Sequence, residues 1–141
     1  MNIKLIKIGI NASPKRAIDV FSKIGYMCIP FNVNRRTHEK QKVVEVIRNH
    51  KIYSQTLKDT LIFEGIISIL NRKDFWIGKP DFLIWNNEEL YFCEFKSRRD
   101  TLRLNQIEWM EKFSMLPIAI AMPCLLDKDK QKEEDSYIAT H

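Results

Sequence analysis

The segment KPDFLIWNNEELYFCEFK, residues 79–96, decides the fold because it holds two apolar runs separated by a short polar turn. Residues 81–85 and 90–96 are rich in the aromatic and branched side chains that favour β-strands. The four residues between them, 86–89, are two asparagines and two glutamates, which suit a tight loop. The segment therefore predicts a β-hairpin with a four-residue loop.

The register of this hairpin brings two carboxylates together. If residues 86–89 form the loop, Trp85 pairs with Leu90, and counting outward places Asp81 directly across from Glu94. Opposed residues in an antiparallel pair have Cβ atoms about 4.5–5.5 Å apart. Lys96 lies two residues beyond Glu94, so its side chain points to the same face of the sheet.

Both faces of the hairpin are otherwise apolar, which predicts that it lies inside the sheet with both sides covered. The face with the two acids also carries Leu83, Trp85 and Phe92, and the other carries Phe82, Ile84, Tyr91, Cys93 and Phe95. Two acids at the end of a buried hairpin are costly unless a positive charge compensates them.

A divalent cation together with Lys96 would provide that compensation. Asp81, Glu94 and the backbone carbonyl of Phe95 are hard oxygen donors of the kind that Mg²⁺ and Mn²⁺ prefer. Lys96 would then stabilise or orient a nucleophilic hydroxide in phosphodiester hydrolysis. The alternative is structural: Asp81 opens a strand after Pro80, and Glu94 and Lys96 form an exposed pair.

The rest of the chain predicts an α/β domain with a mixed sheet flanked by helices. Ser13 and Pro14 suit the start of a helix that runs to Ile24, and residues 37–50 have helical spacing. Residues 56–72 are apolar, and their isoleucines and Gly65 leave helix and strand as alternatives. The remaining predicted elements are strands at 3–10, 26–33 and 118–122 and a helix at 101–115.

Composition limits the class of protein. The chain of 141 residues, 45% of them apolar and 29% charged, suits one soluble globular domain, with residues 127–141 as a solvated tail. A net charge of +5 favours polyanionic partners. Neither a signal peptide nor a membrane-spanning run is visible, so we expect an intracellular, cytoplasmic protein, including one encoded by a virus or mobile element.

Cysteine and histidine supply no recognisable metal site. Cys28, Cys93 and Cys124 lack Cys-x-x-Cys spacing, so we interpret them as reduced, buried thiols. His38, His50 and His141 have no ligand spacing and are assigned no role.

Lys79-Pro80-Asp81, followed by Glu94-Phe95-Lys96 and by a helix with Gln106 and Trp109, resembles the PD-(D/E)xK nuclease superfamily. The stretch LRLNQIEWM, residues 102–110, is similar to the VRR-NUC branch, and EFKSRR, residues 94–99, resembles archaeal Holliday-junction resolvases. The match covers about residues 76–122. It implies a restriction-endonuclease-like fold with a helical insertion before the catalytic hairpin, and a site lined by Gln106.

Such nucleases usually add an upstream acidic ligand from a helix. The candidates are Asp19, Glu39, Glu45 and Glu64, and the sequence does not choose among them. We rank Glu64 slightly first because it lies in the apolar stretch IFEGII, where an unpaired carboxylate would be costly. Asp19 fits if the first helix is the first helix of the family.

Other residues near the motif have two interpretations each. Arg98, Arg99 and Arg103 could contact phosphates or form a solvated basic loop. Gln106 could line the site, as the resemblance implies, or be an ordinary exposed helix residue. Trp109 is better explained as core packing than as a base-stacking platform.

The sequence thus predicts a Mg²⁺- or Mn²⁺-dependent DNA endonuclease that is selective for junctions or flaps. The resemblance to resolvases suggests a homodimer, because two strands need two sites. One alternative is a nucleic-acid-binding module that keeps the nuclease fold without cleaving. Another is a basic protein-interaction domain, such as an inhibitor from a mobile element.

Overall fold

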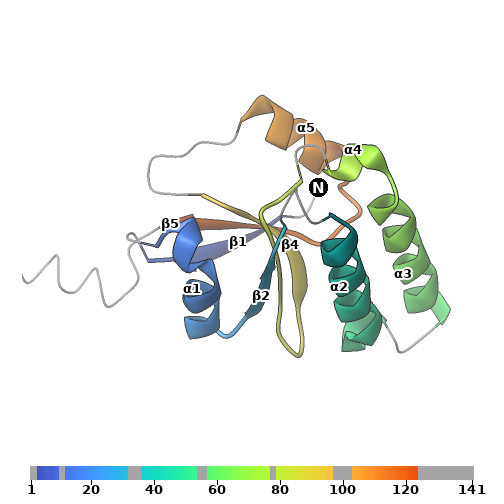
Figure 1. Ribbon diagram of the computed structural model, residues 1–141, viewed down its shortest axis with the longest axis horizontal. Coiled ribbons are helices and arrows are strands. Elements are labelled where there is room, and N and C mark those ends of the chain that lie inside the picture. Colours follow the sequence, from blue (N-terminus) through green and yellow to red (C-terminus); the bar gives the residue numbers. More distant parts are fainter. Residues whose placement is uncertain are drawn as a thin grey trace, which may run out of the picture.

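The protein forms a five-stranded mixed sheet with helices on both faces (Figure 1). This computed structural model describes residues 3–9, 12–31, 36–53, 57–76, 79–96 and 103–123, without the side chains of residues 36–39 and 57–60. The predicted tail at 127–141 lies outside the described residues. The α/β class and the mixed, helix-flanked sheet are confirmed.

The observed elements follow the predicted order, which begins with a strand and continues with helix, strand, helical insertion, hairpin, helix and strand. The strands are β1 (Ile3–Ile8), β2 (Met27–Pro30), β3 (Phe82–Trp85), β4 (Leu90–Phe95) and β5 (Ile118–Pro123). The helices are α1 (Ala17–Lys23), α2 (Arg36–Asn49), α3 (Leu57–Leu70), α4 (Lys73–Trp76) and α5 (Leu104–Lys112), with 3-10 helices η1 (Pro14–Arg16) and η3 (Lys51–Tyr53).

The hairpin lies inside the sheet, as its two apolar faces predict. The strand order is β1-β5-β4-β3-β2, so β3 and β4 each have a neighbour on both sides. β2 and β3 are antiparallel, as are β3 and β4, whereas β4 and β5 are parallel, as are β5 and β1. Trp85 pairs with Leu90 and Phe82 with Cys93, which confirms the predicted register.

The loop of the hairpin is fixed by hydrogen bonds within the loop and by one from His50. Asn86 Oδ1 accepts hydrogen bonds from the backbone N–H groups of Glu88 (3.0 Å) and Glu89 (2.8 Å), which explains why asparagine suits this position. His50 is buried and donates from Nε2 to the Asn86 carbonyl oxygen over 2.7 Å, while its Nδ1 accepts from the Ile52 N–H. His50 therefore has a structural role that the sequence did not reveal.

The two faces of the sheet belong to two separate hydrophobic cores. Leu83 and Phe92 join a cluster with side chains of α2, α3, α4 and α5, and Trp85 packs against it. Phe82, Ile84, Cys93 and Phe95 join a second cluster with Ala17 and Phe21 of α1, and Tyr91 packs against that one. This division is the one that the alternating pattern predicts.

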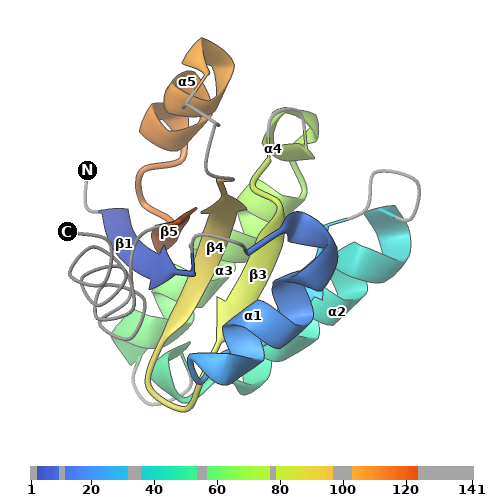
Figure 2. The same cartoon turned by 90° about the vertical axis from the view of Figure 1, so that its left-hand side faces the viewer.

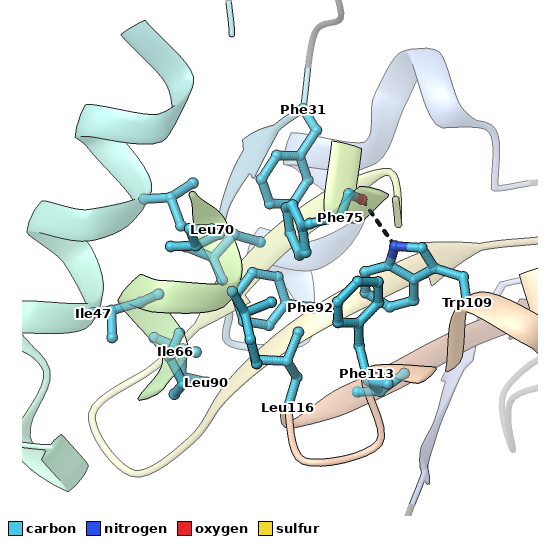
Figure 3. Packing of buried hydrophobic residues seen from close by; sticks show 14 of the residues in the cluster. Phe31, Ile47, Ile66, Leu70, Phe75, Leu90, Phe92, Trp109, Phe113 and Leu116 are labelled. Carbon is cyan, nitrogen blue, oxygen red and sulfur yellow. Dashed lines mark hydrogen bonds between the residues drawn. The ribbon is translucent and has the colours of Figure 1, made fainter. Parts of the chain in front are cut away.

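Aromatic rings dominate the larger core (Figure 3). Phe75 of α4 contacts Phe31, Phe92, Trp109 and Phe113, with ring centroids 5.5–6.2 Å apart. The Trp109 indole N–H donates to the Phe75 carbonyl oxygen over 2.8 Å (dashed in Figure 3). Trp109 is therefore a core residue, as predicted, and it fixes α5 against α4.

Residues 57–70, for which the sequence left helix and strand open, are helical. Phe63, Ile66, Ile69 and Leu70 are buried at the spacing of three and four residues that one helical face requires. The predicted helix start at Ser13 and Pro14 is also observed. Ser13 is extended and Pro14 is the first helical residue, but the Ser13 side chain makes no capping hydrogen bond.

Candidate active site at the end of the hairpin

Asp81 and Glu94 lie at the open end of the hairpin. Continuing the observed register by one residue from Phe82 and Cys93 places Asp81 opposite Glu94. Asp81 Oδ2 accepts a hydrogen bond of 3.0 Å from the Phe95 N–H, which fixes its carboxylate beside β4. Asp81 is exposed, whereas Glu94 is only 5% exposed and Lys96 only 6%. The site therefore opens to solvent on the side of Asp81.

Gln106 of α5 joins the two buried charges of the site. Its Nε2 donates to Glu94 Oε1 over 2.7 Å, and its Oε1 accepts from Lys96 Nζ over 2.7 Å. Lys96 Nζ also lies 3.4 Å from Glu94 Oε1. The three side chains therefore form a closed network in which each charged group has a partner, as buried charges require.

The same glutamine lies in the first turn of helix α5. Gln106 Oε1 also accepts from the backbone N–H of Arg103 over 3.0 Å, so its side chain caps the first turn. A single residue thus ties the start of the helix to Lys96 and Glu94. Through these contacts, Gln106 holds the start of α5 next to the end of β4.

Burial and repulsion act together on the Glu94 carboxylate. Burial, and next the nearby charge of Asp81, raise the pKa of Glu94 to about 7, although the Lys96 ammonium opposes the shift. Two carboxylates in one partly desolvated place resist holding two negative charges. A bound cation would lower this electrostatic cost.

The backbone carbonyl of Phe95 is the candidate third oxygen at this place. The N–H of Phe95 faces Asp81, whereas the N–H of Lys96 bonds to Ala121 of β5, so the polar groups of Phe95 point toward β3. The paired register ends at Phe82 and Cys93. Continued by two residues, it would set Pro80, which has no N–H to donate, opposite Phe95. In that register, position 80 would not give the Phe95 carbonyl a ladder hydrogen bond.

The sequence interpretation gave Pro80 no role beyond preceding the strand. The available signal was a proline two residues beyond the paired register, across from the middle residue of Glu-x-Lys. Two carboxylates and one carbonyl are oxygen donors that fit Mg²⁺ or Mn²⁺.

Among the described residues, the upstream acid that we ranked first is not brought together with Asp81 and Glu94. Glu64 is exposed on α3, so the premise that it is buried in an apolar segment is wrong. Within the described side chains, no group of three or more His, Cys, Asp or Glu residues comes together as a metal site. Asp19 and Glu45 are exposed on α1 and α2, and the side chain of Glu39 lies outside the described set.

The remaining predicted residues are placed as follows. Arg103 is exposed at the start of α5, and Arg98 and Arg99 lie outside the described residues. Cys93 is a buried free thiol and Cys28 a half-buried one, while Cys124 and His141, like the side chain of His38, are outside the described part. Burial raises the pKa of Cys28 to about 12, as expected for an unreactive thiol.

Comparison of the chain with protein families, curated proteins and solved structures found no match. Among the helices that the structure describes, none has the length and hydrophobicity needed to cross a bilayer.

Proposed function

We propose that this protein is a Mg²⁺- or Mn²⁺-dependent nuclease that hydrolyses phosphodiester bonds in DNA. The observation that carries the proposal is the meeting of Asp81, Glu94 and Lys96 at the solvent-open end of an otherwise apolar hairpin. A buried carboxylate with a raised pKa, set beside a second carboxylate, is a common feature of functional sites.

Each residue of the candidate active site has a role in this proposal. Asp81, Glu94 and the Phe95 carbonyl would hold the cation. When bound, the cation would neutralise charge on the phosphate and make a bound water more acidic. Lys96 would orient the attacking water and stabilise the developing negative charge, and Gln106 would keep Lys96 and Glu94 in place.

The resemblance to PD-(D/E)xK nucleases supports the same assignment. The residues that carry the resemblance are Asp81, immediately before β3, Glu94 and Lys96, at the end of β4, and Gln106, in the first turn of α5. We propose on this basis a restriction-endonuclease-like domain of the VRR-NUC or resolvase type. Selectivity for junctions or flaps, and action as a homodimer with one site for each strand, belong to the same proposal.

One specific observation favours a second candidate, a non-cleaving nucleic-acid-binding module with the same fold. Glu94, Lys96 and Gln106 already bond to one another, so each of them has a partner without any ligand. In that case basic residues such as Arg98, Arg99 and Arg103 would dominate binding, and affinity would depend on salt and not on metal.

One experiment separates the two candidates. The purified chain is incubated with labelled four-way-junction DNA, flap DNA and linear duplex, each with Mn²⁺, with Mg²⁺ and with EDTA. The nuclease predicts fragments from a branched substrate with either metal and none with EDTA. Binding to all three substrates without fragments under any condition would favour the binding module.

A further inference from the structure

The proposed active site lies at one particular edge of the sheet. Strands β1, β2, β4 and β5 all run in the same direction, so their carboxyl ends meet at this edge. β3 runs the opposite way and begins there, next to Asp81. We call this boundary the site edge; Figure 2 shows it at the upper end of β4 and β3.

Two exposed cations follow β1 at the site edge. Lys15 and Arg16 belong to η1, which leads directly into α1, and both side chains are exposed. In Figures 1 and 2 the beginning of this blue helix lies at the same end of the sheet as the end of β4. These two residues are far from residues 79–96 in sequence, and the sheet order brings them to the same edge.

The position of this pair is not one that favours basic residues. Lys15 and Arg16 end η1 and directly precede α1, where the positive end of the α1 backbone dipole makes basic residues less favourable than acidic ones. Among the described residues, the ion pairs found elsewhere join Lys51 to Glu88, and Arg72 and Lys112 to Asp74. None of the ion pairs within this described part includes Lys15 or Arg16, even though Asp19 lies one helical turn away.

A third cation lies across the site. Arg103 is exposed and precedes α5, whose Trp109 and Met110 pack into the larger core. α1 packs through Ala17 and Phe21 against the other face of the sheet. Arg103 and the Lys15–Arg16 pair therefore lie on opposite sides of the sheet at the edge where Asp81 is open to solvent.

We propose that Lys15 and Arg16 contact the sugar–phosphate backbone of DNA on one side of the bond to be cut, with Arg103 on the other side. This inference rests on the proposed function for the position of that bond. It adds two binding residues that the sequence motifs do not indicate. Because such contacts go to phosphates, they would add affinity and orientation without sequence preference.

The test compares two charge reversals of equal size. Lys15→Glu/Arg16→Glu alters the site edge, and Lys23→Glu/Lys42→Glu alters two exposed lysines at the far end of α1 and in α2. Binding to fluorescein-labelled duplex DNA is measured by anisotropy in EDTA over a series of salt concentrations. Because acids suit the start of a helix, the first variant should melt no lower than the native chain.

We expect the site-edge variant to bind at least about tenfold more weakly and to lower the slope of log affinity against log salt by about two. The control should lose much less affinity and keep its slope. Equal losses for both variants, or an unchanged slope for the first, would overturn the inference. Failure of the native chain to bind DNA would overturn it as well.

The two proposals fail in different ways. If the native chain never cleaves but the site-edge variant alone loses affinity, the DNA-contacting surface stands and the nuclease assignment falls. If the native chain cleaves with Mn²⁺ and the site-edge variant binds and cleaves like the control, the surface falls and the nuclease stands.

Discussion

Gln106 Oε1 lies 2.7 Å from Lys96 Nζ, and the same amide donates through Nε2 to Glu94. The side chain of Gln106 therefore accepts a hydrogen bond from the Lys96 ammonium and donates one to the Glu94 carboxylate, and these two groups form a buried ion pair. Replacing the amide by a carboxylate would keep the first contact and remove the second. This asymmetry makes the role of Gln106 testable.

Gln106→Ala should lower both stability and activity. Loss of the cap on the Arg103 N–H and of the two site contacts should cost about 1–2 kcal/mol of unfolding free energy. Cleavage should fall about 10- to 100-fold, as is usual when a residue that supports a metal site is removed. Thermal melts and cleavage rates with Mn²⁺ measure the two effects.

Gln106→Glu is the matched control for that variant. Its carboxylate still accepts from Lys96 and from the Arg103 N–H, but it cannot donate to Glu94 and it adds a negative charge there. We expect it to recover more of the stability than of the activity. Equal recovery of both would indicate that Gln106 acts only as a helix cap.

Pro80→Ala tests the oxygen donated by Phe95. An N–H at position 80 would bond to the Phe95 carbonyl and compete with the cation, so Mn²⁺ affinity should fall. Stability should change by no more than about 1 kcal/mol, because a new hydrogen bond offsets the greater freedom of the unfolded chain. Pro30→Ala, at the end of β2 and paired with Phe82, is the control. Equal Mn²⁺ affinity in the native chain and Pro80→Ala, measured by calorimetry, would contradict this role.

Glu94→Gln should stabilise the metal-free protein at high pH. Burial and Asp81 raise the pKa of Glu94 from 4.5 to about 7, so the folded state holds this proton more tightly than the unfolded state. The contribution of this proton to the stability of the folded state is complete below pH 4.5 and is lost as the pH rises through 7. The native chain should therefore lose stability over this interval, relative to Glu94→Gln, by about 1 kcal/mol or more.

Melting curves in EDTA at pH 5 and pH 8 measure that difference. The gap between Glu94→Gln and the native chain should widen in favour of the variant at pH 8, and Mn²⁺ should stabilise only the native chain. A variant that becomes relatively less stable at pH 8 would show that the Glu94–Lys96 ion pair contributes more than the burial costs.

Trp109→Phe separates core packing from base stacking. Loss of the indole N–H leaves the buried Phe75 carbonyl without its 2.8 Å donor, and the smaller ring leaves a void, so we expect a loss of about 1–3 kcal/mol. DNA affinity at a temperature where the variant is folded should be unchanged. A fall in affinity without a fall in stability would instead indicate a DNA contact.

The hairpin and its register were predictable because side chains alternate between the two faces of a strand and a four-residue loop fixes which residues pair. Once Trp85 pairs with Leu90, the faces of Leu83, Phe92 and the two acids follow from geometry. The helical state of residues 57–70 was not predictable, because an isoleucine-rich apolar segment suits either structure.

The parts of the site that depend on distant elements were harder to predict. The upstream acid could not be chosen, since Glu64 lies in an apolar stretch of sequence yet faces solvent on its helix. The link from Gln106 to Glu94 depends on how α5 packs on the core through Trp109. Lys15 and Arg16 reach the site edge only because β1 pairs with β5, far away in the chain.

The most direct test of the account is the rate at which Asp81→Asn and Lys96→Met cleave labelled junction DNA with Mn²⁺, compared with the native chain. DNA binding in EDTA is measured in parallel as the control for folding. The account predicts fragments from the native chain and a loss of about 100-fold or more in each variant, with binding largely retained. Cleavage by both variants at the native, metal-dependent rate would contradict it.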